Sequence, residues 1–189
     1  MAKQFKRIDQ PHREFIANQK IFFNASAAAE GRVNISPRDA KSLRLLDDHT
    51  VAYLDLTGSG NETAAHVSSN GRLTLMFCAF DGPPTILRLY GTGRVLRRGS
   101  PEYKAMLARH FNDEEPLGAR QLMVMDVDLV QTSCGYNVPR FDYRGERDTL
   151  TRWAEKKGPE GLETYRREKN LRSIDGLPTR LMDESEPGA

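Results

Sequence analysis

The sequence predicts a mostly β protein, an antiparallel β-barrel with a few added helices. Six segments within the first 130 residues are apolar or alternate between apolar and polar residues, as strands do, and short links join them. Helical segments occur singly among these strands, whereas an alternating βαβ sheet has a helix after each strand. Hydrophobic residues form about 43% of residues 1–130 and about 27% of residues 131–189. We therefore expect a barrel domain in 1–130 and a polar helical arm in 131–189 that packs on the barrel or on a partner.

The first two strands are predicted at residues 21–27 and 32–36. Apolar and polar residues alternate in both, so each strand should have one apolar and one polar face. Pro37 is expected to end the second strand, because proline has no N–H to donate to the sheet. The polar face of that second strand carries Arg32, Asn34 and Ser36.

Four more strands complete the predicted barrel, at residues 50–56, 72–80, 85–96 and 122–130. The segment 72–80 is apolar at nearly every position, as in a strand that is buried on both faces. One face of the segment 85–96 carries Ile86, Arg88, Tyr90, Thr92 and Arg94. The inward side chains of the last strand are expected to be Met123, Met125, Val127 and Leu129.

Four helices are predicted from start and stop signals. The first covers residues 61–69 and ends at Gly71, and the second begins at Pro101 behind the capping residue Ser100 and ends near residue 111. The other two lie in the polar arm, at 148–157 and 159–169, and Gly158 separates them.

Composition excludes several classes of protein. The formal net charge of +2, with no long basic stripe, disfavours nucleic-acid binding. No apolar run approaches the ~20 residues of a membrane helix, and the first residues lack a secretory signal, so a cytoplasmic protein is expected. Cys78 and Cys134 have no further Cys or His at ligand spacing and the four histidines are scattered, so neither a disulfide framework nor a metal site is expected.

The segment from Thr57 to Thr63 leads from a strand into a helix and is rich in glycine and small polar residues. The free N–H groups and the dipole of a first helical turn suit a phosphate, and glycine lets the backbone approach it. The donors would come from Ser59, Asn61 and Thr63. The alternative is an ordinary helix cap, in which Ser59 or Asn61 binds only the backbone. Glu62 would repel a phosphate unless its carboxylate points away.

A second candidate site is the polar face of the 32–36 strand, together with Arg38 just beyond it. Such a face is either a solvated exterior or a ligand groove in which arginine binds an anion through two hydrogen bonds. The face that carries Arg88 allows the same two interpretations. No catalytic residue is identified from the sequence.

Several runs of this sequence resemble the flavin-binding split barrels related to pyridoxamine 5′-phosphate oxidase. The resemblance covers about residues 12–130 and lies in the runs 31–37 (GRVNISP), 58–63 (GSGNET) and 75–84 (LMFCAFDGPP). It implies a six-stranded Greek-key split barrel that forms a homodimer and binds FMN at the subunit interface. In such proteins the second strand and the helix after the third strand hold the phosphate.

The resemblance, together with the two candidate sites, selects the cofactor-binding residues. They are Arg32, Asn34, Ser36, Arg38, Ser59, Gly60, Asn61, Glu62, Thr63, Arg88 and Trp153. Arg88 belongs to the strand that lends side chains near the flavin, and Trp153 to an arm that can cover the site. True pyridoxamine phosphate oxidases have Ser-Arg-Lys where this chain has Asn61-Glu62-Thr63, which argues against oxidation of vitamin B6.

The function expected from the resemblance is an FMN-dependent oxidoreductase that transfers a hydride or electrons to or from a small molecule. A non-catalytic protein that carries or senses flavin or haem is the alternative, and a deazaflavin could replace FMN in the same groove. Reduction of bound flavin by a nicotinamide nucleotide would distinguish an enzyme from a carrier.

Overall fold

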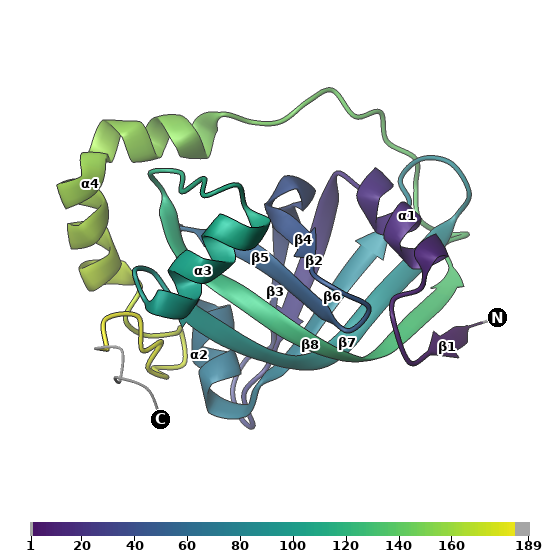
Figure 1. Ribbon diagram of the computed structural model, residues 1–189, viewed down its shortest axis with the longest axis horizontal. Coiled ribbons are helices and arrows are strands. Elements are labelled where there is room, and N and C mark those ends of the chain that lie inside the picture. The colour runs from purple at the N-terminus through teal and green to yellow at the C-terminus, as the bar shows by residue number, and fades with distance from the viewer. Residues whose placement is uncertain (1, 184–189) are drawn as a thin grey trace.

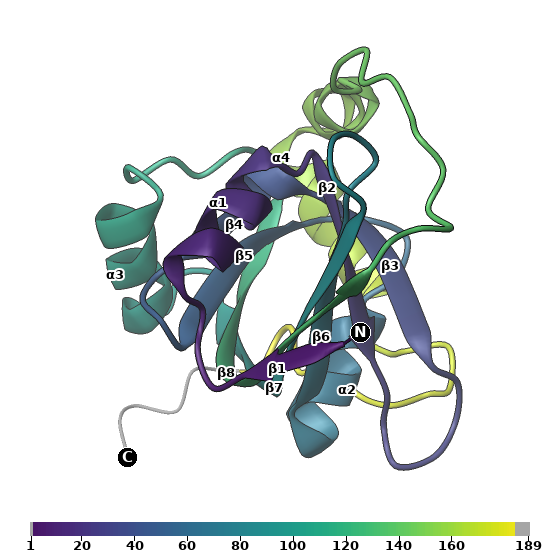
Figure 2. The ribbon, with the colours of Figure 1, turned by 90° about the vertical axis from the view of Figure 1, so that its right-hand side faces the viewer.

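A curled antiparallel sheet of eight strands forms the body of the protein in the computed structural model, which describes residues 2–183 (Figure 1). The strands are β1 (Lys3–Phe5), β2 (Ile21–Ser26), β3 (Asn34–Asp39), β4 (Leu43–Leu45), β5 (Thr50–Leu56), β6 (Arg72–Cys78), β7 (Thr85–Arg97) and β8 (Ala119–Cys134). Their order in the sheet is β3-β2-β6-β7-β8-β5-β4, and β1 pairs with the C-terminal half of β8. Figure 2 shows the sheet curling into a half-open barrel. The predicted mostly β split barrel is confirmed, and the short strands β1 and β4 add to the six expected.

The predicted helices are present, and one helix was not expected. α2 (Glu62–Asn70) ends at Gly71, which has a φ of 72° and so accommodates the left-handed turn. α3 (Pro101–His110) begins behind Ser100, whose side chain accepts a hydrogen bond from the backbone N–H of Tyr103. α4 (Thr149–Lys169) consists of the two predicted arm helices, which join at a break at Gly158. The short α1 (Gln10–Asn18) was not predicted.

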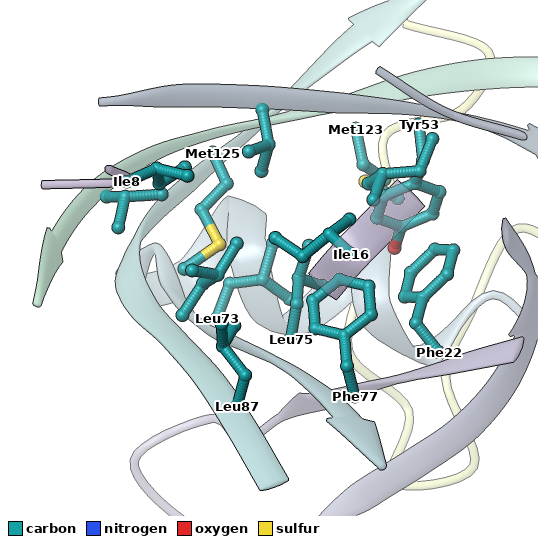
Figure 3. Close-up of a cluster of buried hydrophobic side chains, with 14 of the residues drawn as sticks. Ile8, Ile16, Phe22, Tyr53, Leu73, Leu75, Phe77, Leu87, Met123 and Met125 are labelled. Carbon is teal, nitrogen blue, oxygen red and sulfur yellow. The ribbon is translucent and has the colours of Figure 1, made fainter. Parts of the chain in front are cut away.

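The core lies inside the curl of the sheet (Figure 3). The inward side chains of β6 and β7, such as Leu75 and Leu89, are fully buried, and Phe22 of β2 packs edge-on against Tyr53 of β5. A second cluster lies on the other side of β5 and β8, where Leu122 and its neighbours pack against α3. Burial of this apolar surface stabilises the barrel without disulfides.

The edge strand β3 runs further than expected. The prediction that Pro37 ends it is wrong, because β3 continues to Asp39. β3 pairs only with β2, along the whole of its length. An edge strand tolerates a residue without an N–H, whereas a central strand would lose a ladder hydrogen bond.

The polar faces of β2 and β3 point into the barrel, and their apolar faces point out. Asn24 and Ser26 are buried, whereas Val33 and Ile35 are 69% and 66% exposed. The outward residues of β2, such as Phe23, are only partly buried. The solvated-exterior interpretation is therefore wrong for Asn34 and Ser36, whereas Arg32, just before β3, is 70% exposed. The sheet presents apolar side chains to the outside here.

A β-bulge in β8 changes which side chains point inward. Met123, Met125 and Val127 are buried as predicted, but the pairing with β7 shifts between Tyr90 and Gly91, and Asp128 is the extra residue. Because one extra residue reverses the alternation, Val130 is fully buried and Leu129 turns outward, contrary to the prediction.

The C-terminal arm leaves the barrel after β8, which runs past residue 130 to Cys134. Residues 135–148 cross the top of the molecule as a long connection to α4 (Figure 1). The chain after α4 then returns beside α2 and the β2–β3 hairpin (Figure 2). Within residues 2–183, no helix is both long and apolar enough to cross a membrane.

Candidate functional site

Polar side chains from β2, β3 and α2 meet at the end of the barrel nearest α2. Thr63 of α2 accepts hydrogen bonds from the amide groups of Asn24 at 2.6 Å and Asn34 at 3.1 Å. Ser36 donates to Asn34 at 3.0 Å, and Arg38 donates through Nε to Asn24 at 3.0 Å. The structure thus brings together Asn34, Ser36, Arg38 and Thr63, which the sequence analysis selected from two separate segments.

A buried carboxylate extends this group of residues into the barrel wall. Asp55 of β5 accepts hydrogen bonds from Arg120 at 2.7 and 3.0 Å and from Gln121 at 2.8 Å. Its other oxygen lies 3.2 Å from Nη1 of Arg38, although the angles do not make a hydrogen bond. Burial alone would raise the pKa of Asp55, but the charges of Arg120 and Arg38 outweigh burial and hold this pKa below its ordinary value.

Arg38 is the cation of this cluster that reaches solvent. Its side chain is 26% exposed, whereas those of Asp55 and Arg120 are 1% exposed. Its Nε donates to Asn24 and its Nη1 lies 3.2 Å from Asp55, so Nη2 is the nitrogen that these two residues leave for a further partner. An anion at this surface would meet a guanidinium that is already held in place from behind.

Several buried polar atoms of the cluster lack a hydrogen-bond partner among the described residues. They are the hydroxyl of Tyr53, Oδ1 of Asp55 and Oε1 of Gln121. Burial raises the pKa of Tyr53 far above neutrality, so its hydroxyl keeps its proton. Buried polar groups without partners are costly and are commonly satisfied by water or a ligand. The interior end of the cluster is therefore suited to accept a further polar molecule.

The glycine-containing loop before α2 is held by the C-terminal arm. The side chain of Asn61 makes no capping hydrogen bond to α2, contrary to the helix-cap interpretation for this residue. Instead it accepts from Gln121 at 2.7 Å and donates to the carbonyl of Asn170 at 3.2 Å. Gly60 accepts a hydrogen bond from Arg120 through its carbonyl, at 2.9 Å. The exposed Ser59 lies outside these contacts.

Glu62 and Arg32, which the sequence placed near the phosphate, both bind the arm instead. Both carboxylate oxygens of Glu62 accept from the backbone N–H of Ile174, at 3.1 and 3.0 Å, so the arm supplies a partner for this charge. Arg32 is 70% exposed and forms an ion pair with Asp175, which also accepts from the Arg32 backbone N–H at 2.7 Å. A carboxylate of the chain itself thus occupies the anion-binding groups of Arg32.

Two predicted residues lie away from the polar cluster within one chain. Arg88 is on the outer face of the sheet, because it pairs in register with Met76 and Gln131, and it donates to Ser133 at 3.3 Å. Trp153 packs edge-on against Tyr165 within α4. The structure therefore does not join Arg88 or Trp153 to the cluster of Asn34, Ser36, Arg38 and Thr63.

The residues that support Arg38 from behind were not predicted from the sequence. Asp55 is a single carboxylate in an otherwise apolar strand, and this isolation was the signal that could have identified it, since a buried carboxylate needs a cation. Arg120 and Gln121 stand at the start of an apolar strand in the same way. Their meeting with Asp55 depends on the pairing of β5 with β8, which no local pattern reveals.

Comparisons with known proteins agree with this fold. Residues 8–134 match the family model described as pyridoxamine 5′-phosphate oxidase. The ustO protein of Aspergillus flavus, described as a pyridoxamine 5′-phosphate oxidase family protein, is 38% identical over 182 residues, which cover 88% of this chain and 73% of that protein.

Two crystal structures support the same relationship at the level of fold. A variant of HupZ from Group A Streptococcus is 24% identical with a TM-score of 0.54, covering 67% of this chain and 99% of that one. A candidate pyridoxamine 5′-phosphate oxidase from Lactobacillus delbrueckii is 16% identical with a TM-score of 0.51, covering 67% of this chain and 94% of that one. Together with the family model and the ustO relative, these findings show that the chain belongs to the pyridoxamine 5′-phosphate oxidase family.

Proposed function

We propose that this protein binds FMN through the polar cluster at the end of the barrel and uses it in an oxidoreductase reaction with a small molecule. The observation that carries the proposal is the partly exposed Arg38, held by Asn24 and Asp55 beside Ser36 and Asn34 on the barrel wall. The resemblance of this chain to the flavin-binding split barrels implies flavin binding at these same elements. When bound, the flavin supplies hydride or electron transfer.

The residues of the cluster fit an anchor for a phosphate group. Arg38 provides a guanidinium that can bind phosphate oxygens through two hydrogen bonds, and the Ser36 hydroxyl lies on the same face of β3. The carboxylate of Glu62 accepts a hydrogen bond from the backbone N–H of Ile174 in the arm, which offsets part of its negative charge. A Cβ placed on Gly58 would meet nothing within 4 Å, whereas one on Gly60 would lie 3.6 Å from Oε1 of Glu62, so the open part of the loop before α2 is at Gly58. The role of Asp55 is to orient Arg38, because its charge lies behind the guanidinium.

We propose further that the protein acts as a homodimer through the outer face of the sheet. The exposed Val33 and Ile35 lie on the same side of the sheet as the partly buried Phe23 and Met76. Such an apolar sheet face suits contact with a second copy. Arg88 belongs to this face, so a dimer would bring it toward the partner's site rather than its own.

A carrier or sensor that binds flavin without turnover is the second candidate. The titratable groups buried in the cluster favour it, because the pKa of Tyr53 is raised and that of Asp55 is lowered, so neither exchanges a proton near neutral pH. Reduction of the bound flavin by NADH or NADPH supports the oxidoreductase. Flavin that binds but is reduced by neither nucleotide supports the carrier.

Titration of FMN fluorescence against the purified protein tests the flavin proposal. We expect quenching with wild type and an affinity about tenfold to a hundredfold weaker with Arg38→Gln, because a charge-assisted contact to phosphate is lost. Arg109→Gln, on the exposed side of α3, is the matched control and should bind as wild type does. A wild-type protein that quenches no FMN fluorescence would exclude the proposal. If the folded Arg38→Gln protein bound FMN as tightly as wild type, the phosphate would have to be bound by a residue other than Arg38.

A further inference from the structure

A cavity of about 590 Å³ lies between α3, the start of β8 and the second half of α4. This volume is within the range of small-molecule sites. Its wall has an apolar part, formed by Leu107, Leu181 and Met182, and a charged part. The cations that line it are Arg98, Lys104, Arg120 and Arg166, and the carboxylates are Asp113, Glu115 and Glu163.

Two of these cations are neutralised by carboxylates in close contact. Arg98 donates to both oxygens of Glu115, at 3.0 and 2.9 Å, and the hydroxyl of Tyr103 donates to the same carboxylate at 2.7 Å. Arg120 is neutralised by Asp55 at 2.7 Å, behind the cavity wall. Neither guanidinium therefore requires a further anion.

Arg166 differs from them, because among residues 2–183 no carboxylate is hydrogen-bonded to it. It is 5% exposed, and it donates to two neutral oxygens, the Thr57 hydroxyl at 2.9 Å and the Ala119 carbonyl at 2.7 Å. Within the same range the nearest carboxylate oxygen, on Glu163, is 3.8 Å from Nη1, and Glu163 binds the exposed Arg167 at 2.8 Å. A buried cation without a closely paired anion carries a large desolvation cost.

The neighbouring cations increase that cost. Burial and then the charge of Arg98 lower the pKa of Arg166, and Arg120 adds to the same repulsion, while the charges of Glu163 and Glu115 oppose this shift without cancelling it. Lys104 brings a further positive charge to the cavity from the exposed face of α3, with no ion pair to any of residues 2–183. An anion in the cavity would relieve this repulsion.

We propose that this cavity binds a small organic anion, a carboxylate or a phosphate ester carried on an apolar body. The anionic group would lie against Arg166 and Lys104, and the apolar body against Leu107, Leu181 and Met182. The site is separate from the surface of Arg38 and Ser36, and it holds whether or not the protein binds FMN.

Isothermal titration calorimetry with benzoate and with phenyl phosphate tests this proposal. We expect wild type to bind at least one probe with a Kd of about 1 mM or tighter, and the stronger of the two identifies the anion. Arg166→Gln should weaken binding at least about tenfold, because it removes the buried charge. Glu163→Gln should tighten it about twofold to fivefold, because it removes the nearest carboxylate. Glu160→Gln, one turn away on α4 and outside the cavity, should leave the affinity unchanged.

The proposal is overturned if neither probe gives heat at about 10 mM. It is also overturned if neither Arg166→Gln nor Glu163→Gln changes the affinity for the probe. Displacement of the probe by saturating FMN would overturn it as well. Circular dichroism establishes whether Arg166→Gln folds. If it does not fold, the exposed Lys104→Glu variant replaces it and should weaken binding several-fold, since it reverses a charge at the cavity. An unchanged affinity of that variant would also overturn the proposal.

Discussion

Asp55 is the residue on which the polar cluster depends. It is buried between Arg120 and Arg38, so its removal leaves a buried guanidinium without its anion. We expect Asp55→Asn to lower the free energy of unfolding by about 3–5 kcal/mol, the usual cost of breaking a buried ion pair. Asp126→Asn is the control, because Asp126 pairs with Arg94 at the surface and its loss should cost less than about 1 kcal/mol. Urea unfolding measures the free energy of unfolding of both variants. Equal losses in the two variants would contradict a buried ion pair at Asp55.

The pH dependence of stability follows from the same carboxylate. The pKa of Asp55 is lower in the folded protein than in the unfolded chain, so its stabilising contribution is complete above the ordinary pKa of about 4. That contribution disappears as the pH falls through the folded-state pKa. We therefore expect the difference in unfolding free energy between wild type and Asp55→Asn to be constant from pH 7 to about pH 5 and to narrow as the pH falls from about 5 to 3. A difference that is constant over this range would argue against an ionised Asp55.

At the scale of single elements, the bulge in β8 depends on a glycine in β7. A Cβ on Gly91 would lie 1.9 Å from the Asp126 carbonyl oxygen, closer than any atomic contact allows. We expect Gly91→Ala to destabilise the protein by about 2 kcal/mol or more, since backbone must move. Gly118→Ala is the control, because its Cβ would make only an ordinary 3.6 Å contact with Ala154. Thermal unfolding compares the two, and an unaffected Gly91→Ala would show that the bulge relaxes freely.

The segment after α4 is held in place by polar residues of the β2–β3 loop and of α2. Asp175 binds Arg32 and Glu62 binds the N–H of Ile174. We expect Asp175→Asn to speed amide hydrogen exchange at Arg32 and Ile174 by about tenfold, because local opening becomes easier. Asp148→Asn, in an exposed pair at the start of α4, should leave these amides unchanged. Mass spectrometry measures the exchange rates. If these amides exchanged as slowly in Asp175→Asn as in wild type, Asp175 would not anchor the segment.

At the scale of the whole molecule, the reversed faces of β2 and β3 motivate the proposed dimer. Val33 and Ile35 are exposed while Asn24 is buried. We expect sedimentation velocity to show a dimer at micromolar concentration, and the double variant Val33→Asp, Ile35→Asp to be a folded monomer, because charges do not tolerate burial at an interface. Replacing the exposed Ile174 with Asp should leave the dimer intact. A monomeric wild type would contradict the proposal.

The six longer strands and the helices α2, α3 and α4 follow from the sequence by itself, because alternation, caps and glycine stops are local signals, whereas α1 and the short strands β1 and β4 do not. The sequence also determined the barrel class and selected Asn34, Ser36, Arg38 and Thr63 from two segments far apart in the chain. It could not reveal that the polar faces of β2 and β3 point inward, since alternation shows two faces without showing which one is buried. It also missed the shift at Asp128, because a bulge arises from the pairing of two strands.

Which charges meet depends on how the strands pair and how the arm folds back, not on local sequence. The pairing of β5 with β8 places Arg120 on Asp55, and the folding back of the arm places Asp175 on Arg32 and Arg166 beneath α3. Arg120 and Asp55 are 65 positions apart in the sequence, and Arg32 and Asp175 are 143 apart. Arg166 and its partner Thr57 are 109 positions apart. Electrostatic partners depend on distance in space and on burial, and neither quantity is encoded in local sequence spacing.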